Sequence, residues 1–203
     1  MYPSPVESLI SSLSRFPTIG KRTATRFAFY LLNAPEEEVE LLLKNIKELR
    51  RSVKLCQLCF RSVTEENELC QVCQSKKRDR STICVVEKET DLLSIESTKE
   101  YNGLYFVLGG TVSPLKKEDF KGVRVKELQE RITQPEKFDL PPIKEVIIAT
   151  NQNTAGEATA LYVERVLGKL NINTTRLGKG LSTGSELEYA DEDTLLHALK
   201  GRK

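Results

Sequence analysis

The sequence predicts a multidomain fold in which an amino-terminal helical region precedes a carboxyl-terminal α/β domain with a mostly parallel sheet. The first third of the chain carries apolar residues at the helical period of about 3.6 residues. From residue 82 onward, β-rich runs alternate with helical stretches, which is typical of parallel strands joined by helices. Between these regions, residues 55–73 hold four of the five cysteines in a stretch too short for an apolar core of its own.

Composition and charge exclude several classes of protein. The chain has 203 residues, of which 39% are hydrophobic, so it can form real cores. Its net charge of only +2 differs from that of a strongly basic nucleic-acid binder, although cations gather between Arg15 and Arg26. The longest apolar runs fall far short of the roughly 18 residues of a membrane span, and the first residues do not begin a signal peptide. We therefore expect a cytoplasmic protein.

Three helices are predicted in the amino-terminal region. A capping box that starts at Ser4, with an apolar stripe behind it, predicts a first helix over about residues 5–15. The segment "FPTIG" breaks this helix, and "KRTATRFAFYLL" resumes the helical pattern. The third helix, "PEEEVELLLKNIKELRRSV", has acids in its first turn and cations in its last, as the helix dipole favours.

The carboxyl-terminal region is predicted to alternate strands and helices. The strands are expected at 82–87, 104–108, 145–149 and 172–176, and the helices near 90–98, 124–133, 157–169 and 191–199. We divide the chain into a helical domain (1–54), a four-cysteine module (55–80), a sheet domain (81–176) and a carboxyl-terminal segment (177–203) with a helical tail.

The cysteines form the strongest single pattern in the chain. Two residues separate Cys56 from Cys59 and Cys70 from Cys73, and ten residues separate the two pairs. Two such knuckles present four thiolates to one tetrahedral zinc ion, which leaves no open position for catalysis. We therefore predict one structural zinc ion per chain. Free thiols or two disulfides are the alternatives, and a reducing cytosol disfavours disulfides. Cys84 lies in an apolar run and is expected to be a core residue.

The stretch "LSRFPTIGKRTATRFAF" resembles a helix-hairpin-helix, in which a short turn joins two helices. Such a hairpin points the backbone N–H groups of Gly20 and Lys21 at a phosphate, from the start of a helix whose dipole favours anions. Lys21, Arg22 and Arg26 add positive charge, so the resemblance implies DNA binding that is independent of sequence and weakened by salt. Thr18 stands where the pattern usually has glycine. The alternative is an ordinary pair of packed helices.

The stretches "TICVVEKETDLLSIE" and "IIATNQNTAGEATA" resemble a Toprim domain, the metal-binding unit of topoisomerases, primases and some nucleases. In the catalytic members a glutamate ends the first strand, here Glu87, and an Asp-x-Asp follows a later strand. Asn151 and Asn153 stand at the aspartate positions. Because magnesium favours anionic oxygens, only Glu87 and Glu157 would be left to hold it. The resemblance therefore predicts a Toprim scaffold without its catalytic metal site.

The order of hairpin, four-cysteine module and Toprim domain, with "GSELEYADEDTL" at 184–195, resembles the RecR family of bacterial recombination mediators over nearly the whole chain. This resemblance implies a cytoplasmic, nucleoid-associated protein that is not an enzyme, assembles as a ring-like tetramer and clamps DNA. It also implies that the protein acts together with RecO and, in many bacteria, with RecF. Together they help load the RecA recombinase onto gapped DNA coated by single-strand binding protein.

A ring would bring several copies of the cationic hairpin to one central hole, so that avidity compensates for the low net charge. In such a protein Glu87 and Glu157 are candidate acidic contacts for a basic partner such as RecO. Local hydrogen bonding at the strand end is the alternative role for these two carboxylates.

Two other classes of function remain open. A magnesium-dependent Toprim nuclease or topoisomerase-like enzyme would require Glu87 and a bound ion. A zinc-ribbon interaction module without a DNA role would tolerate charge reversal at the hairpin but not the loss of Cys56. A nucleotide-binding P-loop is disfavoured because "GKRT" and "LGKGLSTG" lack its glycine spacing. The single histidine, His197, has no nucleophile beside it in the sequence.

Overall fold

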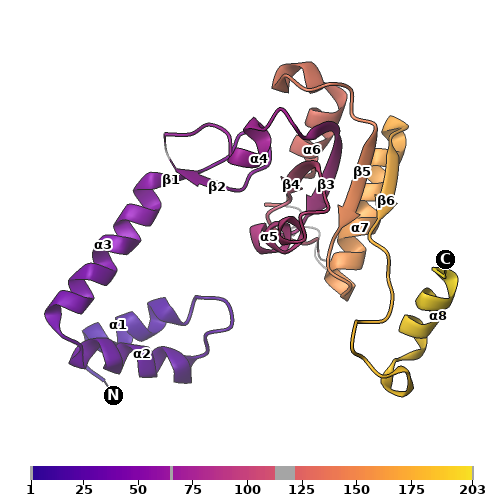
Figure 1. Cartoon of the computed structure of the whole chain (residues 1–203). Coiled ribbons are helices and arrows are strands. Elements are labelled where there is room, and N and C mark those ends of the chain that lie inside the picture. The colour runs from indigo at the N-terminus through magenta and orange to yellow at the C-terminus, as the bar shows by residue number, and fades with distance from the viewer. Residues whose placement is uncertain (1, 65, 113–121, 203) are drawn as a thin grey trace. The chain divides into compact units, whose positions relative to one another are not determined.

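The computed structural model describes residues 2–64, 66–112 and 122–202 and is drawn in Figure 1. The chain forms two compact units, Met1–Val53 and Lys54–Lys203. The fold class predicted from the sequence, helical and α/β regions in that order, is confirmed. The finer division into four segments stays a prediction. None of the described helices is long and apolar enough to cross a membrane.

Three helices make up the amino-terminal unit: α1 (Ser4–Leu13), α2 (Lys21–Asn33) and α3 (Glu36–Ser52). α1 and α2 pack against each other through the buried side chains of Ile10, Ala24 and Ala28. The distance between two packed helices depends on the side chains at their contact, so the two alanines allow a close approach.

The predicted capping box at Ser4 is wrong. Helix α1 begins at Ser4 itself, and Pro3 is the residue before it. The Pro3 carbonyl accepts hydrogen bonds from the backbone N–H groups of Val6 at 2.9 Å and Glu7 at 3.2 Å. Pro5 lies in the first turn of the helix. Backbone N–H groups there have no partner within the helix, so the N–H that proline lacks costs no hydrogen bond. The helix thus starts one residue earlier than the capping pattern implied, and no described side chain caps it.

The amino-terminal unit leaves much of its apolar surface exposed. α3 has no buried residue. Its large apolar side chains are 42% to 62% exposed, and these are Leu41, Leu42, Leu43, Ile46 and Leu49. A groove of about 310 Å³ lies between the three helices and is lined by apolar side chains, among them Val6, Leu9 and Leu31. We call this groove, together with the exposed apolar residues of α3, the apolar helical face.

The cysteine-rich module contains short elements that the sequence did not predict. Strands β1 (Val53–Leu55) and β2 (Ser62–Thr64) pair with each other ahead of the single-turn helix α4 (Gln71–Gln74). Apolar periodicity is too weak over three or four residues to reveal such elements, because their positions depend on the cysteine knuckles.

A four-stranded parallel sheet follows, in the order β4-β3-β5-β6. Its strands are β3 (Asp79–Val86), β4 (Gly103–Val107), β5 (Glu145–Ala149) and β6 (Asn173–Arg176). Every residue of β4 is buried, as a parallel sheet covered on both faces requires.

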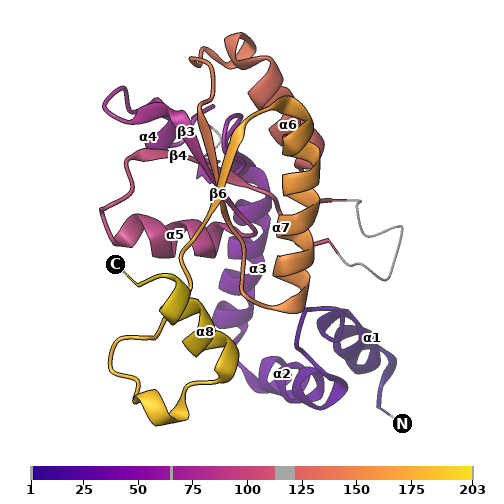
Figure 2. The ribbon, with the colours of Figure 1, turned by 90° about the vertical axis from the view of Figure 1, so that its right-hand side faces the viewer.

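Helices cover both faces of this sheet, as Figure 2 shows. α5 (Glu89–Ser97) lies on one face, and α6 (Val125–Thr133) and α7 (Thr154–Leu167) lie on the other. α8 (Glu192–Lys200) comes near the end of the chain. Short 3-10 helices span Pro135–Phe138, Gly168–Leu170 and Leu187–Tyr189.

The chain reverses its direction across the sheet between β3 and β5. After β3 it crosses to β4 on one side, whereas after β5 it crosses to β6 on the other, and β3 and β5 pair with each other. Val86 and Ala149, the last residues of these two strands, lie opposite each other. Ligands of open α/β sheets bind at such a point, because the connections diverge there. Glu87 and Asn151 follow the two strand ends.

The cysteine-rich module and the sheet share one apolar core. Leu58 of the module belongs to the same buried cluster as the residues of β3 and β4. The rings of Phe60 and Phe106 pack edge to face with centroids 5.2 Å apart. The Val107 N–H donates to the Cys59 carbonyl at 2.8 Å. The module therefore obtains from the sheet the core that its own short length does not provide.

Candidate functional site

The hairpin between α1 and α2 is a tight turn over Phe16–Ile19. The Ile19 N–H donates to the Phe16 carbonyl at 3.2 Å, and Pro17 occupies the second position of the turn. Thr18, at the third position, has a φ of 66°, in the left-handed region that this position requires and that favours glycine. The left-handed conformation costs a residue with a Cβ about 1–2 kcal/mol. The hairpin thus keeps its turn although the expected glycine is replaced.

Helix α2 begins with its first backbone donors uncapped. Gly20, the residue before the helix, is extended and has no side chain that accepts from the first-turn N–H groups, and no other described side chain caps them. A Cβ built on Gly20 would meet no atom within 4 Å, so the space around it is open. Unpaired N–H groups at a helix start attract anions such as phosphate.

Three cations lie along this helix start. Lys21, Arg22 and Arg26 are exposed, and none of them forms an ion pair with a described residue. Arg22 and Arg26 lie one turn apart on the same side of the helix. The first turn contains no acidic residue. The start of α2 therefore combines N–H donors with unpaired positive charge, and DNA contact by these residues stays a prediction.

The structure brings the four cysteines of the module together. We call Cys56, Cys59, Cys70 and Cys73 the four-cysteine cluster. Their sulfur atoms all lie within 4.8 Å of one another, and all four residues are buried. A tetrahedral ion with metal–sulfur distances of about 2.3 Å separates its sulfurs by about 3.8 Å, so the cluster has a suitable size. No other metal-binding group of three or more side chains was found within the described ranges. The cluster can therefore bind one metal ion.

Hydrogen bonds within the cluster favour thiolates at some positions and thiols at others. The Cys70 N–H donates to Cys56 Sγ at 3.3 Å, and the Cys73 N–H donates to Cys70 Sγ at 3.5 Å. Hydrogen bonding with Cys59 lowers the pKa of Cys56, whereas hydrogen bonding with Cys56 raises the pKa of Cys73. A cation bound among the four sulfur atoms would favour their thiolate forms.

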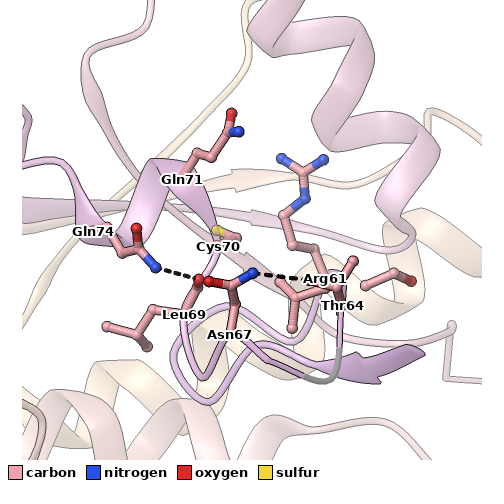
Figure 3. A pocket seen from close by; sticks show the side chains of 9 residues that line it. Arg61, Thr64, Asn67, Leu69, Cys70, Gln71 and Gln74 are labelled. Carbon is pink, nitrogen blue, oxygen red and sulfur yellow. Dashed lines mark hydrogen bonds between the residues drawn. The ribbon is translucent and has the colours of Figure 1, made fainter. Parts of the chain in front are cut away.

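A pocket of about 440 Å³ lies beside the cluster and is shown from close by in Figure 3. Its lining is part polar and part apolar. The Asn67 amide donates to Thr64 Oγ1 at 2.8 Å, and the Gln74 amide donates to the Leu69 carbonyl at 2.8 Å. Of the four cysteines only Cys70 lines the pocket, and it is 5% exposed. A metal ion at the cluster would thus be closed off from this pocket, as is typical of a structural site.

The end of β3 holds a buried carboxylate whose two oxygens each accept a hydrogen bond. Glu87 is 2% exposed. Its Oε1 accepts from the Asn151 backbone N–H at 2.7 Å, and its Oε2 accepts from the Asn151 side-chain amide at 2.6 Å. An aspartate at position 151 could not donate the second bond, because a carboxylate has no N–H group. Of the two roles considered for Glu87, local hydrogen bonding is the one seen here.

Asn153 and Gly156 complete this region, which we call the strand-end corner (Glu87, Asn151, Asn153 and Gly156). The Asn153 side chain caps α7, with its Oδ1 accepting from the Gly156 N–H at 2.8 Å. A Cβ on Gly156 would overlap the Asn151 carbonyl oxygen and would lie 2.7 Å from Glu87 Oε1. Glycine is therefore required where α7 starts directly against the corner. No sequence motif predicts this steric role, because it depends on the close approach of Asn151 and Glu87.

The strand-end corner does not fit a magnesium ion. Magnesium takes oxygen ligands in a near-octahedral arrangement and favours carboxylates. Both oxygens of Glu87 already accept hydrogen bonds, Asn151 directs its side-chain nitrogen at Glu87, and the Asn153 oxygen caps a helix. The side chains that would have to bind an ion bind one another instead.

Glu157 belongs to a separate ion-pair network. Its Oε1 lies 2.7 Å from Lys179 Nζ, and its Oε2 lies 2.7 Å from Arg176 Nη1. Arg176 also pairs with Glu164 at 2.6 Å. Hydrogen bonding from Lys179 and Arg176 lowers the pKa of Glu157. Both cations lie in and after β6, and no motif in the sequence links them to Glu157.

Three family models match successive parts of the chain. The model described as RecR, helix-hairpin-helix, matches residues 6–50, and the Toprim domain model matches residues 81–178. The model described as RecR, C-terminal, matches residues 180–203. The matched segments follow the order of the hairpin, the sheet and the terminal helix in the structure.

Curated relatives match the chain over nearly its full length. The recombination protein RecR of Enterococcus faecalis is 44% identical over 202 residues, which cover 100% of this chain and 98% of the relative. The RecR of Cutibacterium acnes is 42% identical over 202 residues, with 100% and 96% covered. The RecR of Dehalococcoides mccartyi is 42% identical over 198 residues, with 98% and 93% covered. Since this identity extends through hairpin, cysteine module and sheet alike, the chain belongs to the RecR family.

Proposed function

We propose that this chain is a DNA-binding clamp of recombinational repair and is not itself an enzyme. It assembles as a ring-like homotetramer in the bacterial cytoplasm, at the nucleoid, and binds DNA independently of sequence. It acts with RecO, and with RecF where that protein is present, to help load RecA on gapped or single-stranded DNA coated by single-strand binding protein. Membership of the RecR family supports this proposal, since its relatives are named recombination proteins.

The observation that carries the DNA-binding proposal is the uncapped start of α2 beside three unpaired cations. The N–H groups that follow Gly20 donate hydrogen bonds to phosphate oxygens, and Lys21, Arg22 and Arg26 neutralise phosphate charge. Phosphate contacts position a protein on DNA but do not read its sequence. Each neutralised phosphate releases counterions, so the affinity decreases as the salt concentration rises.

The apolar helical face supports self-association. Large contiguous apolar patches are uncommon on soluble monomers and mark surfaces that another molecule covers. The face lies in the same unit as the cationic hairpin. In a ring, a second copy of this chain would cover the apolar helical face. Each added copy also brings another hairpin to the DNA. Several weak contacts then act together, which is how a chain of net charge +2 holds a polyanion.

We assign a single structural zinc ion to the four-cysteine cluster, because tetrahedral sites with four thiolates favour zinc. Four protein ligands leave no position for a substrate. The strand-end corner supports the non-enzymatic part of the proposal in a different way, since both oxygens of the buried Glu87 are engaged with Asn151.

Of the two acidic residues proposed as contacts for RecO, Glu157 is the better candidate. Glu87 is 2% exposed, so a partner reaches it only after the strand-end corner opens. The Glu157 side chain is 35% exposed. A basic partner can exchange with Lys179 or Arg176 there without breaking the core.

Charge reversal at the hairpin tests the DNA-binding proposal. Arg22→Glu combined with Arg26→Glu changes the net charge from +2 to −2, since each reversal subtracts two charges. We expect no measurable binding of gapped DNA at low salt in a filter assay, with an unchanged thermal unfolding transition. Unchanged affinity would contradict the assignment of the hairpin as the DNA-binding surface.

The matched control reverses two exposed cations elsewhere, Lys126→Glu with Lys169→Glu, and has the same net charge. We expect it to retain most of the wild-type affinity. Under the zinc-ribbon alternative both double variants behave like the wild type.

A denaturing gel of the DNA after incubation with magnesium tests the remaining alternative, a Toprim nuclease. We expect intact strands. Cleavage that requires magnesium and disappears in Glu87→Ala would support a Toprim nuclease instead.

A further inference from the structure

Arg131 of α6 is a charged side chain inside the core, 1% exposed. Its Nη1 donates to the Leu58 carbonyl at 2.8 Å and to the Tyr105 carbonyl at 2.9 Å. Leu58 lies between the first two cysteines of the cluster, and Tyr105 lies in β4. One guanidinium nitrogen therefore connects the cysteine-rich module, the sheet and α6.

These two bonds, and the Phe106 ring whose centroid lies 5.9 Å from Arg131 Cζ, supply no full negative charge to balance the buried guanidinium. The Nε and Nη2 atoms of Arg131 have no hydrogen-bond partner among the described residues, and no described carboxylate forms an ion pair with it. A buried cation without a counter-charge strongly disfavours the folded state. The fold therefore requires a source of negative charge near α6.

The four-cysteine cluster is such a source. A divalent ion with four thiolates carries a net charge of −2, and the cluster is as deeply buried as Arg131. The carbonyl that accepts from Arg131 Nη1 at 2.8 Å belongs to Leu58, which lies between the cluster residues Cys56 and Cys59 in the chain. The cluster and the guanidinium are thus close enough in the core to interact electrostatically.

We propose that Arg131 is the charge partner of the metal-bound four-cysteine cluster, so that metal binding by the module and packing of α6 on the sheet stabilise each other. This inference rests on the cluster binding a divalent ion, as proposed above. With the ion bound, the guanidinium offsets part of the cluster's negative charge. Without the ion, the module loses the metal–sulfur bonds that hold its two knuckles together, and Arg131 loses this charge partner. The metal then supports the sheet domain as well as the module.

Zinc affinity tests this coupling. The full-length wild type, Arg131→Met and Arg131→Lys are titrated with a chromophoric zinc chelator. Methionine keeps much of the length but not the charge, and we expect zinc to bind about 10- to 100-fold more weakly, as when an outer partner of a metal site is lost. Lysine keeps the charge but not the paired carbonyl bonds, and we expect a loss below about tenfold.

Arg124→Met is the matched control. Arg124 packs over the Phe60 ring at 4.9 Å and donates to the Val107 carbonyl at 3.2 Å, so it also joins the module to β4. Unlike Arg131 it is partly exposed. We expect wild-type zinc affinity in this variant. Equal affinity in the wild type, Arg131→Met and Arg124→Met would overturn the inference.

Hydrogen exchange of the wild type gives a second readout if Arg131→Met does not fold. Removal of zinc should increase amide exchange in α6 and β4 as well as in the module. Increased exchange confined to residues 54–80 would overturn the inference while leaving the zinc assignment intact. A wild type that binds no zinc would overturn both, so the two failures are distinguishable.

Discussion

The hairpin and the strand-end corner both replace residues that their family patterns expect, but with opposite consequences. At the hairpin, Thr18 stands in place of glycine and still adopts the left-handed backbone of the turn, with a φ of 66°. At the corner, Asn151 stands in place of aspartate and satisfies both oxygens of Glu87. The replacement at the hairpin keeps the geometry of the turn and introduces backbone strain at Thr18. The replacement at the corner puts an amide where the family pattern has a metal-binding carboxylate, and that amide adds a hydrogen bond to Glu87.

The two helices that begin at these sites also differ in their capping. α2 follows Gly20 and has no side-chain cap, whereas α7 follows Asn153, whose side chain caps it. One start offers backbone donors to a ligand and the other does not. We infer that backbone strain is tolerated at the hairpin turn, whereas hydrogen bonds among neighbouring residues close the strand-end corner.

The largest expected effect is that of Gly156→Ala. The added Cβ would overlap the Asn151 carbonyl oxygen and crowd Glu87, so both the corner and the start of α7 must move. We expect a loss of about 4 kcal/mol in the free energy of unfolding, measured with urea. Gly168→Ala is the control, because a Cβ there, just after the same helix, meets no atom within 4 Å. A loss below about 1 kcal/mol for Gly156→Ala would show that the corner is not tightly packed.

Asn151→Asp should have the next largest effect. The variant removes the amide donor and places a second carboxylate against buried Glu87, so we expect a loss of about 3 kcal/mol without divalent ions at neutral pH. Millimolar magnesium should restore part of this stability, because paired carboxylates are ligands it prefers. Urea unfolding with and without magnesium measures both changes.

Asn153→Asp is the control for that experiment. An aspartate keeps the oxygen that accepts from Gly156 and caps helices as well as asparagine does, so we expect a change within about 0.5 kcal/mol and no response to magnesium. If Asn151→Asp were as stable as the wild type in the presence of a chelator, the amide donor would not be what closes the corner.

The smallest effect, and the only gain in stability, is expected for Thr18→Gly. Glycine adopts the left-handed turn without strain but loses more entropy on folding, so the net gain should be about 1 kcal/mol in thermal unfolding. DNA affinity should not change, because the turn stays the same. Thr23→Gly, inside α2, is the control and should lose about 0.3 kcal/mol, the difference in helix propensity between threonine and glycine. A destabilised Thr18→Gly would mean that the threonine side chain supports the hairpin.

The sequence by itself determined the order of the elements and the composition of the candidate sites. Helical and strand periods, turn residues and the spacing of the cysteine knuckles are local properties, so they can be read along the chain. They located all four strands of the sheet and placed Glu87 and Asn151 at strand ends. The short elements β1, β2 and α4 escaped this reading, and the start of α1 was misplaced by one residue, because single-residue shifts barely alter a period.

Only the tertiary structure decided what those residues do to one another. Asn151 meets Glu87 across 64 positions of sequence, and Arg131 meets Leu58 across 73. No local pattern encodes such contacts, because they arise when parallel strands and their covering helices bring distant segments together. The sequence left the strand-end corner without its aspartates. The fold shows that the asparagines there close the corner, and that a single buried arginine joins the cysteine-rich module to the sheet.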